Sequence, residues 1–295
     1  MDPDSFIIAV FCWIDEALPA MTPGHRLRQR GPDPILYDSE VLTMEVVGAY
    51  LGLSQDSALY GYFRRHYAHF FPRLLGVHRT TFVRQAANLW RVKEWLWQRL
   101  VDSVPHDPQL AILDSLPVYA CQFARAPRCR RFRGEAAYGK DHVVKQTFYG
   151  FRLHARVCWP GILTRLCLAP ANVADPDAAP ALTEGTRGIA LGDRLFWRPR
   201  LRAELAHDGV LLLAPFAHAT RDPWPAVSRR ISRLRYRIDT VFGQLAERGA
   251  IKRVWARDLW HLASRLLRLV LMHTLAVHFN VQRDQPPLHL AALVA

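Results

Sequence analysis

The chain has 295 residues, half of them apolar, and a formal net charge of +13 from 39 Lys+Arg against 26 Asp+Glu. This length allows one large or two modest domains with a substantial core. Most of the positive charge is arginine, which favours a nucleic-acid partner first and an anionic membrane surface second. A basic protein from an arginine-rich proteome is the plain alternative.

The cysteines and the apolar runs bear on the compartment. Five cysteines without a C-x-x-C pair argue against a zinc site and a disulfide framework. The N-terminal apolar run follows an acidic start, unlike a secretory signal, and the run LVLMHTLAVHF is short for a membrane span. We therefore expect a cytoplasmic protein with no membrane partner.

The first hundred residues have a helical pattern. An N-cap is predicted at Ser39, before the helical run EVLTMEVVGAYLGL, and residues 79–104 predict one long amphipathic helix that ends before Pro105. Between them, DSALYGYFRRHYAHFFPRLLG mixes aromatic and basic residues. Such faces fit DNA binding and packing or dimerisation about equally. We assign residues 1–107 to a small helical domain.

After residue 107 the pattern changes to strands and helices. Strands are predicted for LAILD, for the alternating run QTFYGFRLHARVCW and, after a Pro-Gly turn, for ILTRLCLA. They are followed by the helix DPDAAPALTEG, the strand GIALGD, the helix RPRLRAELAHDG, the strand VLLLAPF and a basic helix from about Arg229 to Arg248. The predicted order βββαβαβα indicates an α/β domain over 108–280, before a tail at 281–295.

Two predicted strands end in an acid, Asp114 and Asp193. If these strands are parallel neighbours, both carboxylates lie at the same end of the sheet. Close carboxylates repel unless a cation lies between them, and hard oxygen ligands suit Mg²⁺ or Mn²⁺. Each aspartate alone would be interpreted as a cap, but the pair in a basic chain favours a metal site.

A third acid, Asp239, lies at the edge of the apolar stripe of the long basic helix, with Arg235 one turn earlier. A surface ion pair between these two residues is the alternative.

Arginines cluster shortly after Asp114. Five of them occur without an intervening acid: Arg125, Arg128, Arg130, Arg131 and Arg133. We predict that this loop holds DNA phosphates, a solvated basic loop being the alternative. Basic residues are also frequent from Arg221 to Arg268. Further predicted DNA contacts are Lys145, Arg235, Lys252 and Arg253.

The sequence resembles bacterial insertion-sequence transposases of the DDE type, most closely insertion-sequence family 982. The resemblance rests on the order of ILDSLPVYACQFARAPRCRRFRGEAAYG, YGFRLHARVCWPG, LAPANVADPDA, LGDRLFW, RIDTVFGQLAERG and WARDLWHLASRLLRLVLMHTL. No single motif is specific, but the ordered set is. The similarity extends to the helical N-terminal region, so it covers nearly the whole chain.

This resemblance implies an RNase H-like mixed sheet with flanking helices, preceded by a small all-α domain that binds DNA ends. Asp114, Asp193 and Asp239 would hold two Mg²⁺ or Mn²⁺ ions for DNA cleavage and strand transfer, Asp114 contacting both ions. The implied partners are the element ends, target DNA and a second copy of the chain, in a bacterial cytoplasm at the nucleoid.

Two departures from the family pattern keep other functions open. Asp239 stands where the family usually has Glu, and GDRLFW replaces a GDKGY-like turn. The alternatives are a decayed or domesticated DNA-binding protein without catalysis and a metal-dependent nuclease of the same fold.

Overall fold

The computed structural model describes residues 1–21, 27, 31–252 and 255–294. The internal contacts divide the chain into two units. The helical unit consists of Met1–Ser103, Leu245–Ile251 and Trp255–Ala295, and the sheet unit of Val104–Gln244 and Lys252–Val254. The predicted domains 1–107, 108–280 and 281–295 differ from this division at the C-terminal side, because the last long helix packs on helices of the first hundred residues.

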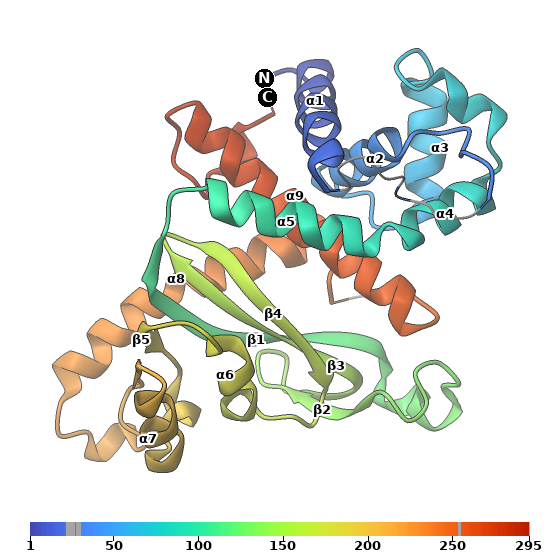
Figure 1. Ribbon diagram of the computed structural model, residues 1–295. Helices are drawn as coiled ribbons and strands as arrows, with labels where there is room; N and C mark the ends of the chain where they lie inside the picture. Colours follow the sequence, from blue (N-terminus) through green and yellow to red (C-terminus); the bar gives the residue numbers. More distant parts are fainter. Residues whose placement is uncertain (22–26, 28–30, 253–254, 295) are drawn as a thin grey trace. The chain divides into compact units, whose positions relative to one another are not determined.

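The sheet unit is a mixed α/β structure (Figure 1). Its strands are β1 (Asp107–Gln122), β2 (Ala137–Asp141), β3 (Gln146–Trp159), β4 (Ile162–Pro170), β5 (Gly188–Leu191) and β6 (Val210–Leu213). Its helices are α6 (Asp175–Thr183), α7 (Pro199–His207) and most of α8 (Pro225–Gly249), with 3-10 turns η2 (Phe123–Arg128), η3 (Arg194–Phe196) and η4 (Ala219–Arg221). The sheet order is β2-β3-β1-β5-β6, and β4 pairs with β3. This arrangement is compatible with an RNase H-like core.

The condition on which the acid pair depends is met, since β1 pairs in parallel with β5. The prediction that the first strand ends at Asp114 is wrong, because β1 continues antiparallel to β3 as far as Gln122. Strand β1 tolerates Pro117 because its pairing with β5 stops at Ile112. On the β5 side of the strand, a residue at position 117 would have no strand carbonyl to which its N–H could donate, so proline loses no hydrogen bond there.

The observed order also contains a strand that the sequence did not predict. Strand β2 pairs with the first residues of β3, from Gln146 to Gly150. Its sequence, AYGKD, lacks the alternation by which a half-buried strand is recognised.

The two faces of β1 meet different helices. Leu113 belongs to a buried cluster that α6 and α7 contribute to, on the face where Ser115 also lies. Members of this cluster are Ala179, Leu182, Ala190, Phe196, Leu201, Leu205, Val210, Leu212 and Ala214. Side chains alternate along a strand, so Asp114 points to the opposite face, where it meets α8.

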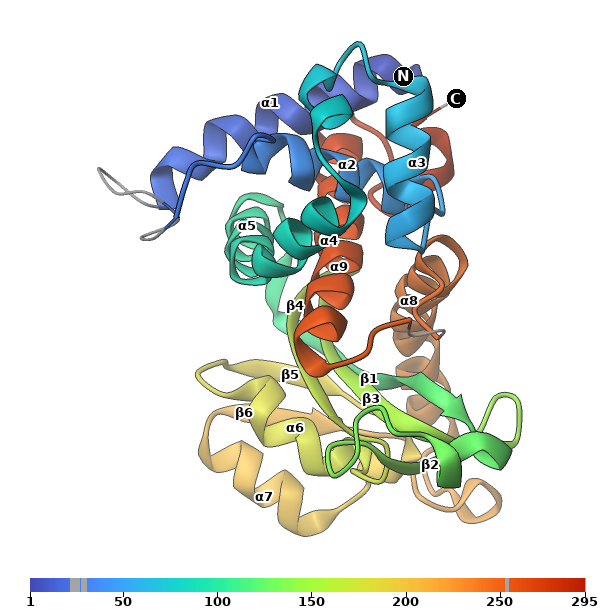
Figure 2. The ribbon, with the colours of Figure 1, turned by 90° about the vertical axis from the view of Figure 1, so that its right-hand side faces the viewer.

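The helical unit contains six helices in its described residues (Figure 2). They are α1 (Pro3–Met21), α2 (Asp38–Tyr50), α3 (Asp56–His66), α4 (Arg79–Asn88), α5 (Trp90–Ser103) and α9 (Leu259–Gln282), with 3-10 turns η1 (Pro72–Gly76) and η5 (Leu290–Ala292). Helix α9 packs on α5 and α2. It is long and apolar enough to cross a membrane, contrary to the expectation from the sequence, but 83% of its most apolar window is buried inside the structure, as in a core helix.

Two predicted helix boundaries are wrong. Helix α2 begins at Asp38, so Tyr37 is the N-cap and Ser39 is buried in the first turn; the Tyr37 N–H donates to Glu40 Oε2 at 2.7 Å. The single helix predicted over 79–104 is two helices, which break at Leu89. Near this break the Ala86 carbonyl accepts hydrogen bonds from the side chains of Lys93 and Ser264, which satisfies part of the helix end.

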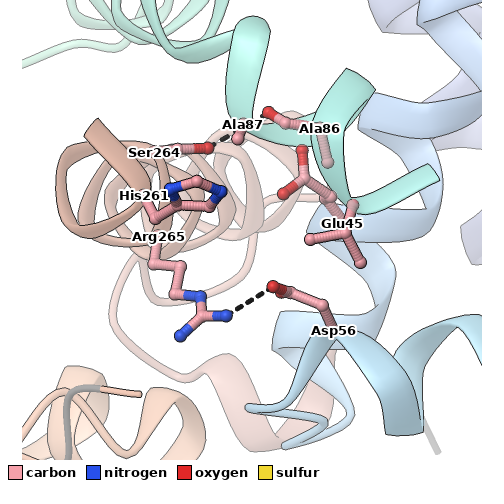
Figure 3. Close-up of a pocket in the computed structure, with 8 residues that line it drawn as sticks. Glu45, Asp56, Ala86, Ala87, His261, Ser264 and Arg265 are labelled. Carbon is pink, nitrogen blue, oxygen red and sulfur yellow. Dashed lines mark hydrogen bonds and ion pairs between the residues drawn. The ribbon is translucent and has the colours of Figure 1, made fainter. Parts of the chain in front are cut away.

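A buried ionic cluster connects four helices of this unit. Lys93 on α5 lies 2.5 Å from Glu45 on α2, and both side chains are almost inaccessible to solvent. Arg268 on α9 reaches Asp56 on α3 at 2.9 Å and Glu45 at 3.6 Å. Figure 3 shows Glu45, Asp56 and Arg265, which line a small cavity. Its volume is about 10 Å³, which is room for one water molecule. Burial raises the pKa of Glu45 and lowers that of Lys93, so each charge depends on the other.

We predict that Glu45→Ala lowers the free energy of unfolding of this unit by about 3–5 kcal/mol, because it leaves the Lys93 ammonium buried without its carboxylate. The double variant Glu45→Leu/Lys93→Met removes both charges and should lose less than the single variant. Urea unfolding followed by circular dichroism measures both. Glu94→Ala, at an exposed position of α5 next to Lys93, should have a free energy of unfolding within about 0.5 kcal/mol of that of the parent. A double variant less stable than Glu45→Ala would contradict the prediction.

Candidate active site

Asp114 and Asp193 come to adjacent positions through the register of two strands. Ile112 on β1 pairs with Leu191 on β5, and each aspartate follows two residues later. Both side chains therefore point to the same face, at neighbouring places on parallel strands. The sequence-predicted acid pair is thus brought together, although Asp114 lies within its strand and Asp193 just beyond the end of β5.

The turn that carries Asp193 is closely packed. Its carboxylate Oδ1 accepts a hydrogen bond from the Leu195 N–H at 2.9 Å and caps η3. A Cβ added at Gly192 would lie 2.4 Å from the Phe196 ring, so only glycine fits under that ring. The GDRLFW turn is therefore closely packed, with Phe196 in the core cluster.

Arg235 on α8 is the cation at the centre of the site. Its NH2 group donates to Asp114 Oδ2 at 2.7 Å, and the two side chains are only 16% and 18% exposed. Its charge also acts on the carboxylates of Asp193 and Asp239. Asp239 follows one turn later on α8 and is solvent-exposed. The three predicted acids thus share one arginine.

The acids are incompletely neutralised by this arginine. Burial raises the pKa of Asp114 to about 7, against the opposing charge of Arg235, and the charges of Asp175 and Asp193 add to the rise. Partial burial also raises the pKa of Asp193 and that of Asp239, whose side chain stays largely exposed, again against Arg235. When ionised, three carboxylates around one guanidinium leave an excess of negative charge, and such a site favours an additional cation.

Asp175, at the start of α6, is a fourth acid that the sequence reasoning missed. Its Oδ1 accepts from Ser115 Oγ at 2.5 Å and lies 3.3 Å from Nδ1 of the buried His154. Arg152 donates to the same Ser115 hydroxyl at 3.2 Å. Although burial alone would raise the pKa of Asp175, the hydrogen bonds from His154 and Ser115 lower it. Its position before Pro176 looked like an ordinary helix start, which hid its place beside the site.

The donor set fits a divalent cation in part. Asp114 and Asp193 supply hard carboxylate oxygens side by side, which suits Mg²⁺ or Mn²⁺ with water and phosphate as the other ligands. Among the described residues, however, no three His, Cys, Asp or Glu side chains form a metal-binding group. The predicted convergence of Asp114, Asp193 and Asp239 on one pair of ions is therefore not present in this conformation; the three acids surround Arg235 instead.

The predicted DNA contacts fall into two groups. The exposed residues are Arg125, Arg128, Arg130, Arg133 and Lys145. Arg131 is half-buried and donates to the Ala120 carbonyl at 2.7 Å, Lys252 pairs with Asp141 at 3.5 Å, and Arg235 binds Asp114. Arg253 lies outside the described residues.

Comparison with known proteins gives one match. The family model described as Transposase DDE domain matches residues 106–258, which is more than half of the chain and includes the whole sheet, the acid pair and Arg235. The chain therefore belongs to the DDE transposase domain family, a class of polynucleotidyl transferases that act on DNA and generally use a divalent metal ion. No curated protein and no solved structure matches the chain.

We predict that Asp114→Asn stabilises the metal-free protein at pH 8. The pKa of Asp114 is raised to about 7 in the folded state from 3.8, so the folded state binds the proton more tightly, and stability falls as pH rises from about 4 to about 7. Removal of the ionisable group should raise the free energy of unfolding by up to about 4 kcal/mol at pH 8 and by little at pH 4. Thermal unfolding in EDTA at both pH values measures this. Asp208→Asn, at an exposed position, serves as the control, and equal stability of Asp114→Asn and the parent at pH 8 would refute the prediction.

Proposed function

We propose that the protein is an insertion-sequence transposase that cuts DNA and joins the ends to a target by metal-dependent phosphoryl transfer. The observation that supports this most is the neighbouring position of Asp114 on β1 and Asp193 just beyond the parallel strand β5, near a helix that carries Arg235 and Asp239. Assignment to insertion-sequence family 982 rests on the ordered segments of the sequence. The partners would be element ends and target DNA, with the protein acting as a dimer.

In this proposal Asp114 and Asp193 hold the divalent ions and Asp239 completes the set. When bound, such ions activate a water or a DNA 3′-hydroxyl and stabilise the leaving oxygen. Arg235 would then pair with a DNA phosphate in place of Asp114. Its buried Nε has no hydrogen-bond partner among the described residues, which leaves a donor for that phosphate.

Two observations favour the non-catalytic alternative. The described residues lack a three-acid group, and Arg235 occupies an oxygen of Asp114 that a metal ion would need. A protein fixed in this conformation would keep its basic surface and bind DNA without cutting it. A metal-dependent nuclease of the same fold would cut but not join, and strand-transfer products on a supercoiled plasmid distinguish it from a transposase.

We predict that Asp239→Ala abolishes Mg²⁺- or Mn²⁺-dependent cleavage of DNA that carries the element ends, while DNA affinity changes less than about threefold, because the basic residues carry the binding. Asp239→Glu should cleave faster than the parent, since one more methylene extends the carboxylate toward the acid pair. Gel assays of plasmid cleavage and fluorescence anisotropy measure the two properties. Asp208→Ala is the control, because it removes an exposed acid away from the site.

The outcomes distinguish the alternatives. An inert parent with an active Asp239→Glu variant would identify the missing methylene as the cause of decay. Cleavage by Asp239→Ala at the parental rate would show that Asp239 is not a ligand and would direct attention to Glu247, further along the same helix. If neither the parent nor Asp239→Glu cleaves DNA, the non-catalytic alternative holds.

We predict that Arg128→Ala/Arg130→Ala weakens DNA binding about equally for all sequences. Both side chains are exposed, whereas Arg131 bonds the backbone and is left intact. The slope of log affinity against log salt should become shallower by about 0.9 for each phosphate that the variant no longer neutralises. Anisotropy titrations at several salt concentrations measure the slope. Arg187→Ala/Arg200→Ala removes the same charge elsewhere on the sheet unit, and a change no larger than that control would mean that the arginine loop is only solvated.

A further inference from the structure

The turn between β2 and β3 carries two exposed apolar side chains. Val143 is 83% exposed and Val144 48% exposed, at the tip of the hairpin that these strands form. Valine favours half-buried sheet surfaces, and neither side chain gains anything from this position in water. The hairpin tip, residues 142–145, therefore presents two apolar side chains to solvent at the end of a turn.

The hairpin tip is held from below by a buried carboxylate. Asp141, 2% exposed, accepts from the Val143 N–H at 2.9 Å through Oδ1 and from the Tyr119 hydroxyl at 2.8 Å through Oδ2. Lys252 lies 3.5 Å from the same Oδ2. Lys145 closes the turn with φ +54°, a left-handed backbone conformation that residues other than glycine adopt uncommonly. The tip is thus pre-organised before any partner binds.

The surroundings of the hairpin tip are basic. Lys140, His142 and Lys145 are exposed beside the two valines, whereas Asp141 is buried and paired. The ring of Tyr138, on β2, and that of Phe123, just after β1, are both exposed, and their centroids lie 5.7 Å apart. Exposed arginines follow Phe123 in the chain. Between residues 122 and 147 the only other acid is Glu135. Two exposed valines surrounded by basic side chains complement a polyanion with an apolar interior, such as the stacked bases of duplex DNA.

We propose that the hairpin tip is a wedge that enters a groove of duplex DNA and parts a base step with Val143 and Val144. Apolar side chains inserted between bases, with cations on the flanking phosphates, are how proteins kink DNA from the groove. The anchor Tyr119 lies five residues along β1 from Asp114, roughly 17 Å in an extended strand, about half a helical turn of DNA. We take the wedge to act on the duplex that the proposed active site holds, and in this respect it rests on the proposed function.

The test uses a mixed-sequence duplex of about 40 base pairs with 2-aminopurine at several adenines, which fluoresces more strongly when its stacking is lost. The parent protein should raise the fluorescence on binding. Val143→Ser/Val144→Ser should lose most of this rise and bind roughly tenfold more weakly, with the salt dependence unchanged because no cation is removed. Val143→Ile/Val144→Ile keeps the apolar surface and should retain the rise. Leu211→Ser, a 50% exposed position on β6, is the matched control and should behave as the parent.

Two results with the serine variant would overturn the wedge. One is a full fluorescence rise and full affinity in the serine variant. The other is a serine variant that changes only the mass of the free protein in light scattering, which would make the tip a self-association surface. Asp114→Asn separates this inference from the proposed function, since it should keep the rise while cleavage is lost. A parent that shows the valine-dependent rise but never cleaves would refute the proposed function alone, and cleavage without the rise would refute the wedge alone.

Discussion

The parallel pairing of β1 with β5 places two negative charges, Asp114 and Asp193, at adjacent positions on one face of the sheet. Like charges in a half-buried position repel and need a cation nearby. Arg235 supplies it from α8, more than a hundred residues further along the chain than Asp114. The ionic contact therefore complements the apolar stripe of α8, which buries Ile231, Ile238 and Val241. The position of the third acid, Asp239, depends on this docking.

The face of the sheet opposite the acid pair supplies apolar burial, which the charged face lacks. Leu113 and its neighbours form an apolar cluster with α6 and α7, and burial of that cluster stabilises a sheet whose other face carries uncompensated charge. Asp175 extends the negative charge to the α6 side, where Ser115, His154 and Arg152 hold it. Four carboxylates thus act on a region with two arginines. This excess of carboxylates over arginines favours the binding of a further cation at the site.

Sequence patterns predicted most of the sheet unit because its central strands and helices have strong periodicity. The acid pair could be predicted from the position of each aspartate after an apolar run, together with the expectation of parallel strands. The continuation of β1 through Pro117 could not, because tolerance of proline depends on which partner strand is absent. Asp175 was missed because its role comes from side chains on β1 and β3 that are distant in sequence. The break at Leu89 was hidden for the same reason, since it involves a buried lysine and Ser264.

The absence of a three-acid group among the described residues and the pairing of Arg235 with Asp114 are two aspects of one feature. Arg235 and Asp239 lie one turn apart on α8, so a guanidinium bound to Asp114 also fixes the distance of Asp239 from the acid pair. A divalent cation and a guanidinium compete for the same carboxylate oxygen, and a bound cation would release Arg235 toward the phosphates of DNA. Under the proposed function, an aspartate at position 239 reaches a cation held by the acid pair only if α8 then settles closer to the sheet than a glutamate would require. Whether an aspartate at position 239 can act as a metal ligand therefore depends on the length of its side chain and also on how far α8 moves when Arg235 leaves Asp114 for a DNA phosphate.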